Sequence, residues 1–164
     1  MKSKWIWALL GVLAIMGAYA GTVLATPPSG QTSTTLARAP FEPMKLKAQS
    51  DPANLWRLKL KTHGISDAYV VGNTFAPNGG TSGWHKHPGP SLIFVTAGTI
   101  TNYMFDGHHC MQEDYTAGQG FVDPGGDDAH MIKNNGGVEA RTIAVQLVQA
   151  GATRPGDADE PNCH

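Results

Sequence analysis

Two histidines separated by one residue are the clearest chemical feature of this sequence. His85 and His87 lie in the segment GGTSGWHKHPGPS, which otherwise consists mainly of Gly, Pro and Ser. Side chains at positions i and i+2 of a β-strand point to the same face, so a strand here would direct both imidazoles to one point. Imidazole nitrogen is a ligand of Fe, Zn, Cu and Ni. The pair is therefore a candidate metal site, and the alternative is two polar side chains in a solvated loop.

A third histidine on a neighbouring strand would make this weak signal strong. His130 is the candidate, because it lies in a strand-like segment directly after the turn DPGGDD. Three neutral imidazoles would leave a divalent metal its full charge, with positions open for water, O₂ or a chelating substrate. This set suits iron, zinc, copper or nickel and does not select among them. The interpretation without function is a group of hydrogen-bonded histidines at the mouth of a barrel.

The two cysteines and the histidines near them are expected to have structural roles or to lie on the surface. Cys110 and Cys163 are expected to form a disulfide if the chain is exported, since oxidising compartments favour this bond. His108 and His109 precede Cys110 directly. They would form a second soft-ligand site if Cys110 were free, and are surface residues if it is bonded. His63 is expected in a solvated loop.

The segments that would position the candidate ligands have the pattern of β-strands. Short runs rich in β-formers, separated by Gly and Pro turns, recur about every ten residues, and no long helical period appears after residue 43. This pattern predicts an all-β fold, a sandwich or a barrel. The expected strand segments are 55–61, 68–75, 91–98, 99–105, 118–126, 129–137 and 138–148.

The first part of the chain has the pattern of an export signal. Residues 1–25 contain Lys2 and Lys4, a long apolar run, and small residues at Val23 and Ala25 spaced as in a cleavage site. The interpretation as a signal peptide and that as an uncleaved membrane anchor both place the domain outside the cytoplasm, either periplasmic or extracellular. Residues 26–50 are expected to form a flexible linker, 51–150 the folded domain and 151–164 a tail.

Charge excludes one class of partner. Removal of residues 1–25 leaves ten basic and 13 acidic residues, a formal charge of −3. Basic residues do not cluster after the N-terminus, so the sequence shows no footprint for nucleic acid. A small-molecule ligand or substrate is expected instead, with membrane contact only through an uncleaved N-terminus.

The histidines fall within two motifs that resemble those of the cupin superfamily. The first motif of that family is a Gly, a His-x-His pair, a Glu and a closing Gly; the second is Gly, Pro-x-Gly, His and Asn. The matching positions here are Gly79, His85, His87 and Gly98, then Gly118, Pro124, Gly126, His130 and Asn134. The resemblance implies a single-domain cupin β-barrel, a double-sheet jelly roll, with His85, His87 and His130 as ligands of one divalent metal. It also implies a homodimer as a possible assembly.

The sequence departs from the family pattern at the glutamate. That position is Ser91 or Leu92, and neither is a carboxylate. Ser91 is expected to hydrogen-bond a metal-bound water, and Asp128 to supply charge near His130 or to cap its turn. A second, smaller departure is one extra residue between Gly126 and His130, which a loop absorbs easily.

Three functions remain open from the sequence. Some cupin dioxygenases use a three-His iron site, so the resemblance implies an iron-dependent oxygenase acting on a small organic substrate, which the pattern of residues 1–25 would place outside the cytoplasm. The alternative is a cupin that binds a metal or a small molecule without turnover. The third possibility is a structural domain whose histidines have lost their role.

Overall fold

A computed structural model describes residues 26–52, 55–153 and 156–161. Within these ranges the chain forms strands and turns and no helix. The strands are β1 (Gln31–Phe41), β2 (Lys45–Gln49), β3 (Arg57–Lys61), β4 (Ser66–Phe75), β5 (Gly80–Thr81), β6 (His85–Lys86), β7 (Ser91–Ala97), β8 (Thr99–Phe105), β9 (Cys110–Thr116), β10 (Gly120–Asp123), β11 (Ala129–Asn134), β12 (Ala140–Gln149) and β13 (Gly156–Asp157).

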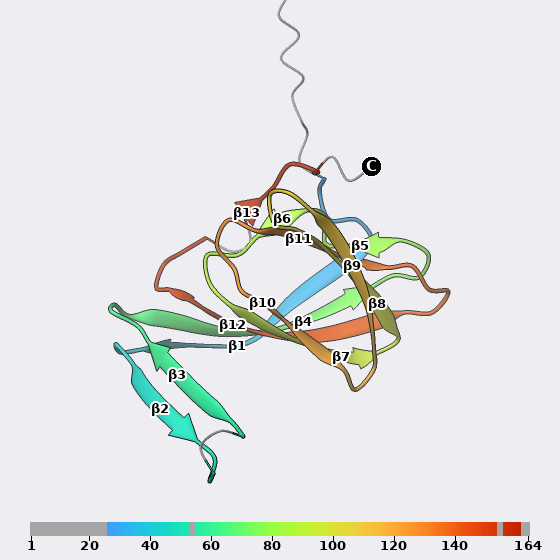
Figure 1. The fold of residues 1–164 in the computed structure, drawn as a ribbon. Helices are drawn as coiled ribbons and strands as arrows, with labels where there is room; N and C mark the ends of the chain where they lie inside the picture. Colours follow the sequence, from blue (N-terminus) through green and yellow to red (C-terminus); the bar gives the residue numbers. More distant parts are fainter. Residues whose placement is uncertain (1–25, 53–54, 154–155, 162–164) are drawn as a thin grey trace, which may run out of the picture.

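Two antiparallel sheets face each other and enclose the core (Figure 1). One has the strand order β1-β4-β12-β7-β10; the other has the order β13-β6-β11-β8-β9, with β5 also paired to β11. The predicted all-β, double-sheet barrel is confirmed. Each of the expected strand segments contains a strand, and all of these strands except β3 belong to the barrel.

Alternating side chains of the strands fill the space between the sheets. In β7, Ser91, Ile93 and Val95 are buried, whereas Leu92 and Phe94 are exposed. This period of two directs one face of the strand inward. The main apolar cluster is Phe75, Ile93, Val95, Ile100, Phe121, Ile132, Ala140 and Ala144. Both sheets contribute to it, so the core fixes how the strands that carry the histidines face each other.

The prediction of a flexible linker over residues 26–50 is wrong. β1 pairs with β4 from Gln31, opposite Phe75, to Phe41, opposite Ser66. Nearly all β1 side chains are exposed, so the strand has no buried apolar alternation that a sequence could reveal. The ladder of main-chain hydrogen bonds to β4 holds it at the sheet edge, where Pro40 is also tolerated. The barrel therefore begins well before residue 51.

The segment predicted as a C-terminal tail is partly tied to the barrel. In β13, Gly156 pairs with Lys86 and Asp157 pairs with His85. The N–H of Ala158 donates a hydrogen bond to the carbonyl oxygen of Trp84 at 3.1 Å. This segment therefore supports the strand that carries the first histidine.

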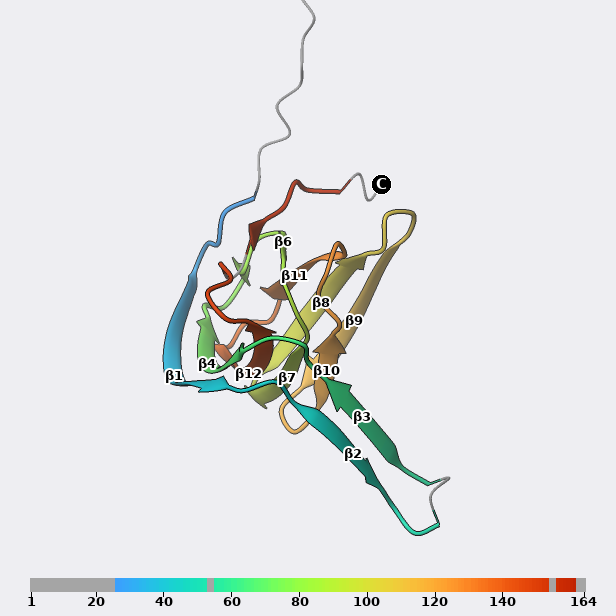
Figure 2. The same ribbon diagram turned by 90° about the vertical axis from the view of Figure 1, so that its left-hand side faces the viewer.

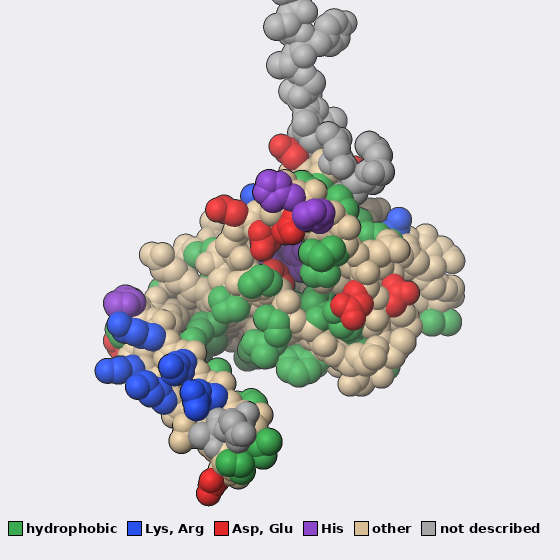
Figure 3. Space-filling view, in the orientation of Figure 1, with side chains coloured by type: hydrophobic (Ala, Val, Ile, Leu, Met, Phe, Trp, Pro, Cys, Tyr) green, Lys and Arg blue, Asp and Glu red, His purple; other side chains and the backbone are tan. Residues whose placement is uncertain are grey.

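Strands β2 and β3 form a hairpin that projects from the barrel (Figure 2). Their register places Lys47 opposite Lys59, and basic side chains gather on one face of the hairpin (Figure 3). The alternate positions are apolar and exposed, with Leu46 at 49% and Leu58 at 43%. The hairpin contributes no residue to the histidine cluster. The homodimer that the cupin resemblance implies stays a prediction.

The predicted signal peptide or anchor, residues 1–25, lies outside the described residues. Within the described part of the chain, no helix has the length and apolar character needed to cross a membrane.

Gly98 joins β7 to β8 in a conformation that favours glycine. Its φ is +68°, and a Cβ atom there would lie 2.7 Å from the carbonyl oxygen of Glu139. We expect Gly98→Ala to lower the free energy of unfolding by at least about 1–2 kcal/mol, measured by urea denaturation. Gly107 has a φ of +91° with open space around the added atom, so Gly107→Ala is the matched control. An equal loss in both variants would contradict a role for the close approach.

Candidate metal centre

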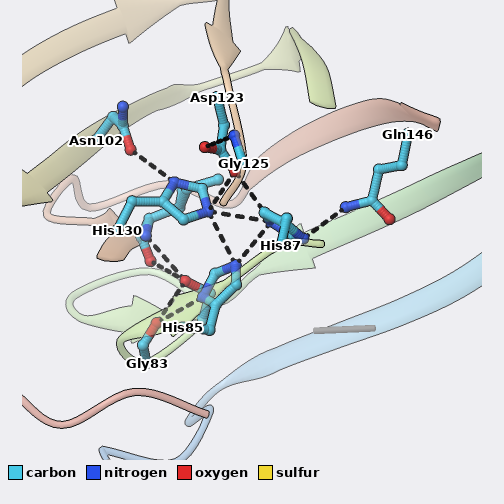
Figure 4. A network of polar contacts seen from close by, with 10 residues as sticks. Gly83, His85, His87, Asn102, Asp123, Gly125, His130 and Gln146 are labelled. Carbon is cyan, nitrogen blue, oxygen red and sulfur yellow. Dashed lines mark hydrogen bonds and ion pairs between the residues drawn. The ribbon is translucent and has the colours of Figure 1, made fainter. Parts of the chain in front are cut away.

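Three imidazoles meet where β6 pairs with β11 (Figure 4). His130 in β11 stands directly opposite His85, the first residue of β6, and His87 follows two residues later. The Nε2 atoms are 3.1 Å apart between His85 and His87, 3.1 Å between His87 and His130, and 3.0 Å between His130 and His85. All three side chains are buried. The structure thus brings the predicted histidines close enough together to hold one metal ion.

Each imidazole is held by a polar partner on its other ring nitrogen, Nδ1. The partners are the Gly83 carbonyl oxygen for His85 at 2.9 Å, Asn102 Oδ1 for His130 at 3.2 Å, and the Gln146 side-chain amide for His87 at 3.1 Å. Oxygen atoms only accept here, so Nδ1 of His85 and His130 carries the hydrogen and Nε2 presents a lone pair. For His87 the neighbouring atom is Gln146 Nε2, an amide nitrogen that donates to Nδ1 and so leaves the ring hydrogen on Nε2. Metal binding by His87 through Nε2 requires the Gln146 amide to turn its oxygen toward Nδ1–H. Such outer contacts are typical of histidine ligands.

The spacing of the Nε2 atoms fits a metal ion. When all three rings have the tautomer that binds metal, their three lone pairs repel at this distance, and a cation between them turns the repulsion into attraction. For metal–nitrogen bonds of about 2.1 Å, atoms 3.0–3.1 Å apart subtend an angle of about 91–95° at the metal. That angle is near the right angle of an octahedral face and smaller than the tetrahedral angle of about 109°. The donor set therefore resembles three adjacent corners of an octahedron.

Burial keeps the cluster in the form that binds metal. Desolvation lowers the pKa of His85 below its usual value of 6.5. Desolvation, followed by the charges of His85 and His87, lowers the pKa of His130 well below that value. Both side chains are therefore neutral near pH 7 in the metal-free protein.

These shifts predict how the metal-free protein responds to pH. His85 and His130 bind protons more readily in the unfolded chain, so their contribution to stability is present above pH 6.5 and is lost as the pH falls below it. Asp123 acts in the opposite sense, because burial raises its pKa above 3.8 and the folded state then holds its proton more tightly. We expect the melting temperature of metal-free protein to fall from pH 7.5 to about pH 5.5. Metal-free His130→Leu should lose part of this slope, and an unchanged slope would contradict the assignment.

A cavity of about 260 Å³ opens onto the three imidazoles from within the barrel. Ser91 and Gln146 line it beside the histidines, and Ile93 and Ala144 are among its apolar walls. A second cavity, of about 200 Å³, also reaches His130. In the space-filling view, a histidine side chain is visible at the bottom of a hollow, below acidic side chains (Figure 3). The cluster therefore adjoins space for a small molecule.

The other predicted site residues lie at different distances from the cluster. Ser91 is fully buried in the same cavity, and its hydroxyl has no hydrogen-bond partner among the described residues. Asp128 is exposed, and its charge adds to the burial that raises the pKa of Asp123. Their roles toward a metal stay predictions.

The predicted disulfide partner Cys163 lies outside the described residues, so that bond also stays a prediction. Cys110 begins β9 on the surface, and His108 and His109 are exposed beside it. Their backbone N–H groups donate hydrogen bonds to Asp106 Oδ1. These two histidines therefore belong to a surface turn, apart from the metal centre.

Asp123 is the residue of this centre that the sequence analysis missed. Its side chain is 5% exposed, and its Oδ2 lies 3.4 Å from Nε2 of both His87 and His130. In the sequence it precedes Pro-Gly-Gly, where an aspartate is typical of a turn. The detectable signal was its place at the end of a strand in the second motif, seven residues before His130.

The comparisons agree with this geometry. The family profile described as Cupin domain matches residues 73–146, which include all three histidines. Residues 73–146 are a cupin domain. Of the two residues that can stand at the glutamate position of the cupin motif, Ser91 is buried and points into the barrel, whereas Leu92 is exposed. No curated protein matches the sequence.

Solved structures similar to this cupin support its fold. Recombinant oxalate oxidase in complex with glycolate has a TM-score of 0.52 and 24% identity, with 81% of this chain and 57% of that chain covered. Peruvianin-I, a cysteine peptidase from Thevetia peruviana latex, has a TM-score of 0.54 and 21% identity, with 83% and 74% covered. This chain spans 46% of another oxalate oxidase chain that it matches. At such identities the likeness shows the fold alone.

Proposed function

We propose that this cupin is an exported, metal-dependent enzyme that holds one divalent transition metal, with iron expected, and catalyses an oxygenase-type reaction on a small organic substrate. The observation that carries the proposal is the convergence of three buried Nε2 atoms beside a cavity. When bound, the metal would act as a Lewis acid and bring substrate and O₂ together.

The protein's own contribution is to fix the ligands and to limit the substrate. The Gly83 carbonyl oxygen and Asn102 hold two imidazoles in the required tautomer. A cavity of about 260 Å³ restricts the substrate to a small molecule. Its mixed lining, with Ser91 and Gln146 near the histidines, suits a substrate with oxygen atoms at one end.

Export is the second part of the proposal. It rests on the basic residues, apolar run and small residues within residues 1–25. Mass spectrometry of the protein recovered from the cell envelope and medium would test it. A chain that begins at Thr26 supports cleavage, an intact chain in the membrane supports an anchor, and an intact chain confined to the cytoplasm would contradict export.

Oxygen consumption tests the reaction. Iron-loaded protein is incubated with small chelating compounds (a diketone, a thiol, a catechol and oxalate) in an oxygen electrode. We expect one class to drive O₂ uptake that His130→Ala, treated identically, does not show. If no compound is turned over and a bound ligand is recovered unchanged, the protein is a binding module instead.

A further inference from the structure

This chain lacks the carboxylate of the cupin motif, but the neighbouring strand carries one. Ser91 occupies the glutamate position in β7, and the sheet register places Asp123 of β10 directly opposite it. Opposed residues of an antiparallel pair point to the same face. Ser91 is 0% and Asp123 is 6% exposed, so both point into the barrel. The inward-facing pair therefore has a hydroxyl on β7 and a carboxylate directly opposite it on β10.

The two oxygens of Asp123 have different surroundings. Oδ1 accepts a hydrogen bond from the Gly125 N–H at 2.9 Å, which fixes the side chain. Oδ2 is buried and accepts no hydrogen bond from any residue in the described ranges. A buried carboxylate oxygen without a donor is costly, and a native structure that keeps one needs a compensating partner.

The two histidines beside Oδ2 do not supply the hydrogen bond that it lacks. Its contacts with Nε2 of His87 and His130 are 3.4 Å, longer than an ordinary N–H···O hydrogen bond. The tautomer fixed by Asn102 leaves Nε2 of His130 without a hydrogen. In Figure 4 Asp123 lies on one side of His87 and His130, and His85 lies on the other. Asp123 Oδ2 and the Nε2 atoms of His85 and His130 therefore converge as electron-pair donors without a hydrogen of their own, a set that a cation satisfies. Nε2 of His87 joins them when the Gln146 amide turns its oxygen toward Nδ1.

We propose that Asp123 Oδ2 is the fourth protein ligand of the metal held by His85, His87 and His130. The inference rests on the proposed metal site and goes beyond it. For bonds of about 2.1 Å, the 3.4 Å separations correspond to about 108° at the metal, within reach of a shared coordination sphere. One carboxylate lowers the charge of a divalent centre from 2+ to 1+ and adds manganese to the metals that the site suits.

Asp123→Asn is the direct test, because Asn keeps the size of the side chain and the acceptor for Gly125. Asp127→Asn is the matched control, since it removes one exposed carboxylate from the same turn. We measure Co(II) affinity by titration and the visible Co(II) spectrum, which reports the ligand set without any activity assay. We expect Asp123→Asn to weaken Co(II) binding about 100-fold or more and to change the spectrum, and Asp127→Asn to stay within about threefold.

A second variant tests whether a carboxylate at position 91 can replace the one at position 123. In Asp123→Asn combined with Ser91→Glu, the carboxylate returns to the place where the family pattern has it, and we expect Co(II) affinity to recover at least tenfold. Unchanged affinity and spectrum in Asp123→Asn would overturn the inference while leaving the three-histidine site intact. If the wild-type protein does not bind Co(II) at all, the metal site on which this inference rests is refuted instead. Melting curves of the metal-free variants establish that each is folded.

Discussion

Replacing His87 and His130 together by alanine is expected to abolish stoichiometric metal binding. The two imidazoles supply two of the three clustered Nε2 atoms, and a single remaining histidine does not hold a metal through purification. Elemental analysis of wild-type and variant protein, purified in parallel, measures the effect. We expect close to one metal per wild-type chain and less than a tenth of that in the variant.

The control for this result uses histidines outside the cluster. His63 and His108 are exposed, so the double replacement His63→Ala with His108→Ala should keep the full metal content. Iron in the wild type supports the oxygenase proposal, whereas zinc, copper or nickel supports the site and argues against that reaction. Metal retained by the variant without His87 and His130 would show that the ion binds elsewhere.

Removing the metal is expected to destabilise the folded protein strongly. A ligand that binds only the folded state stabilises it by about 4 kcal/mol when its free concentration is 1,000 times its dissociation constant. For a domain of this size, such a loss lowers the melting temperature by roughly 10 °C or more. Calorimetry or circular dichroism before and after treatment with a chelator measures the shift.

The same measurement on the variant without His87 and His130 distinguishes metal removal from other effects of the chelator. That variant should melt at one temperature with or without chelator. An unchanged melting temperature in the wild type, despite proven loss of metal, would mean that the ion contributes nothing to the fold. The barrel would then hold the three histidines in place without any stabilisation by the metal.

Local patterns predicted the features of the fold that depend on neighbouring residues. The alternation in β7 and the His85-x-His87 spacing are visible over a few positions, because a strand with one face toward the core, such as β7, buries every second side chain. β1 could not be found in this way. Its side chains are exposed and its stability comes from pairing with β4, whose partner residues are 25 to 44 positions away in the sequence.

The candidate site was predictable to the same extent. Motif spacing located its three histidines, but their partners come from distant strands. Asn102 is 28 residues from His130, and Gln146 is 59 residues from His87. Asp123 faces the cluster only because the register of β7 and β10 sets it opposite Ser91. The register between two strands cannot be read from the sequence of either strand alone.

The projecting hairpin has a consequence for how the family can vary its sequence. β2 and β3 lie within the connection between β1 and β4, whose ends, Phe41 and Ser66, are register partners in the barrel. Because these ends stay together, the segment between them can lengthen, shorten or change its charge without displacing any metal ligand. Evolution can therefore alter the surface that this cupin presents to its surroundings while its chemistry stays constant.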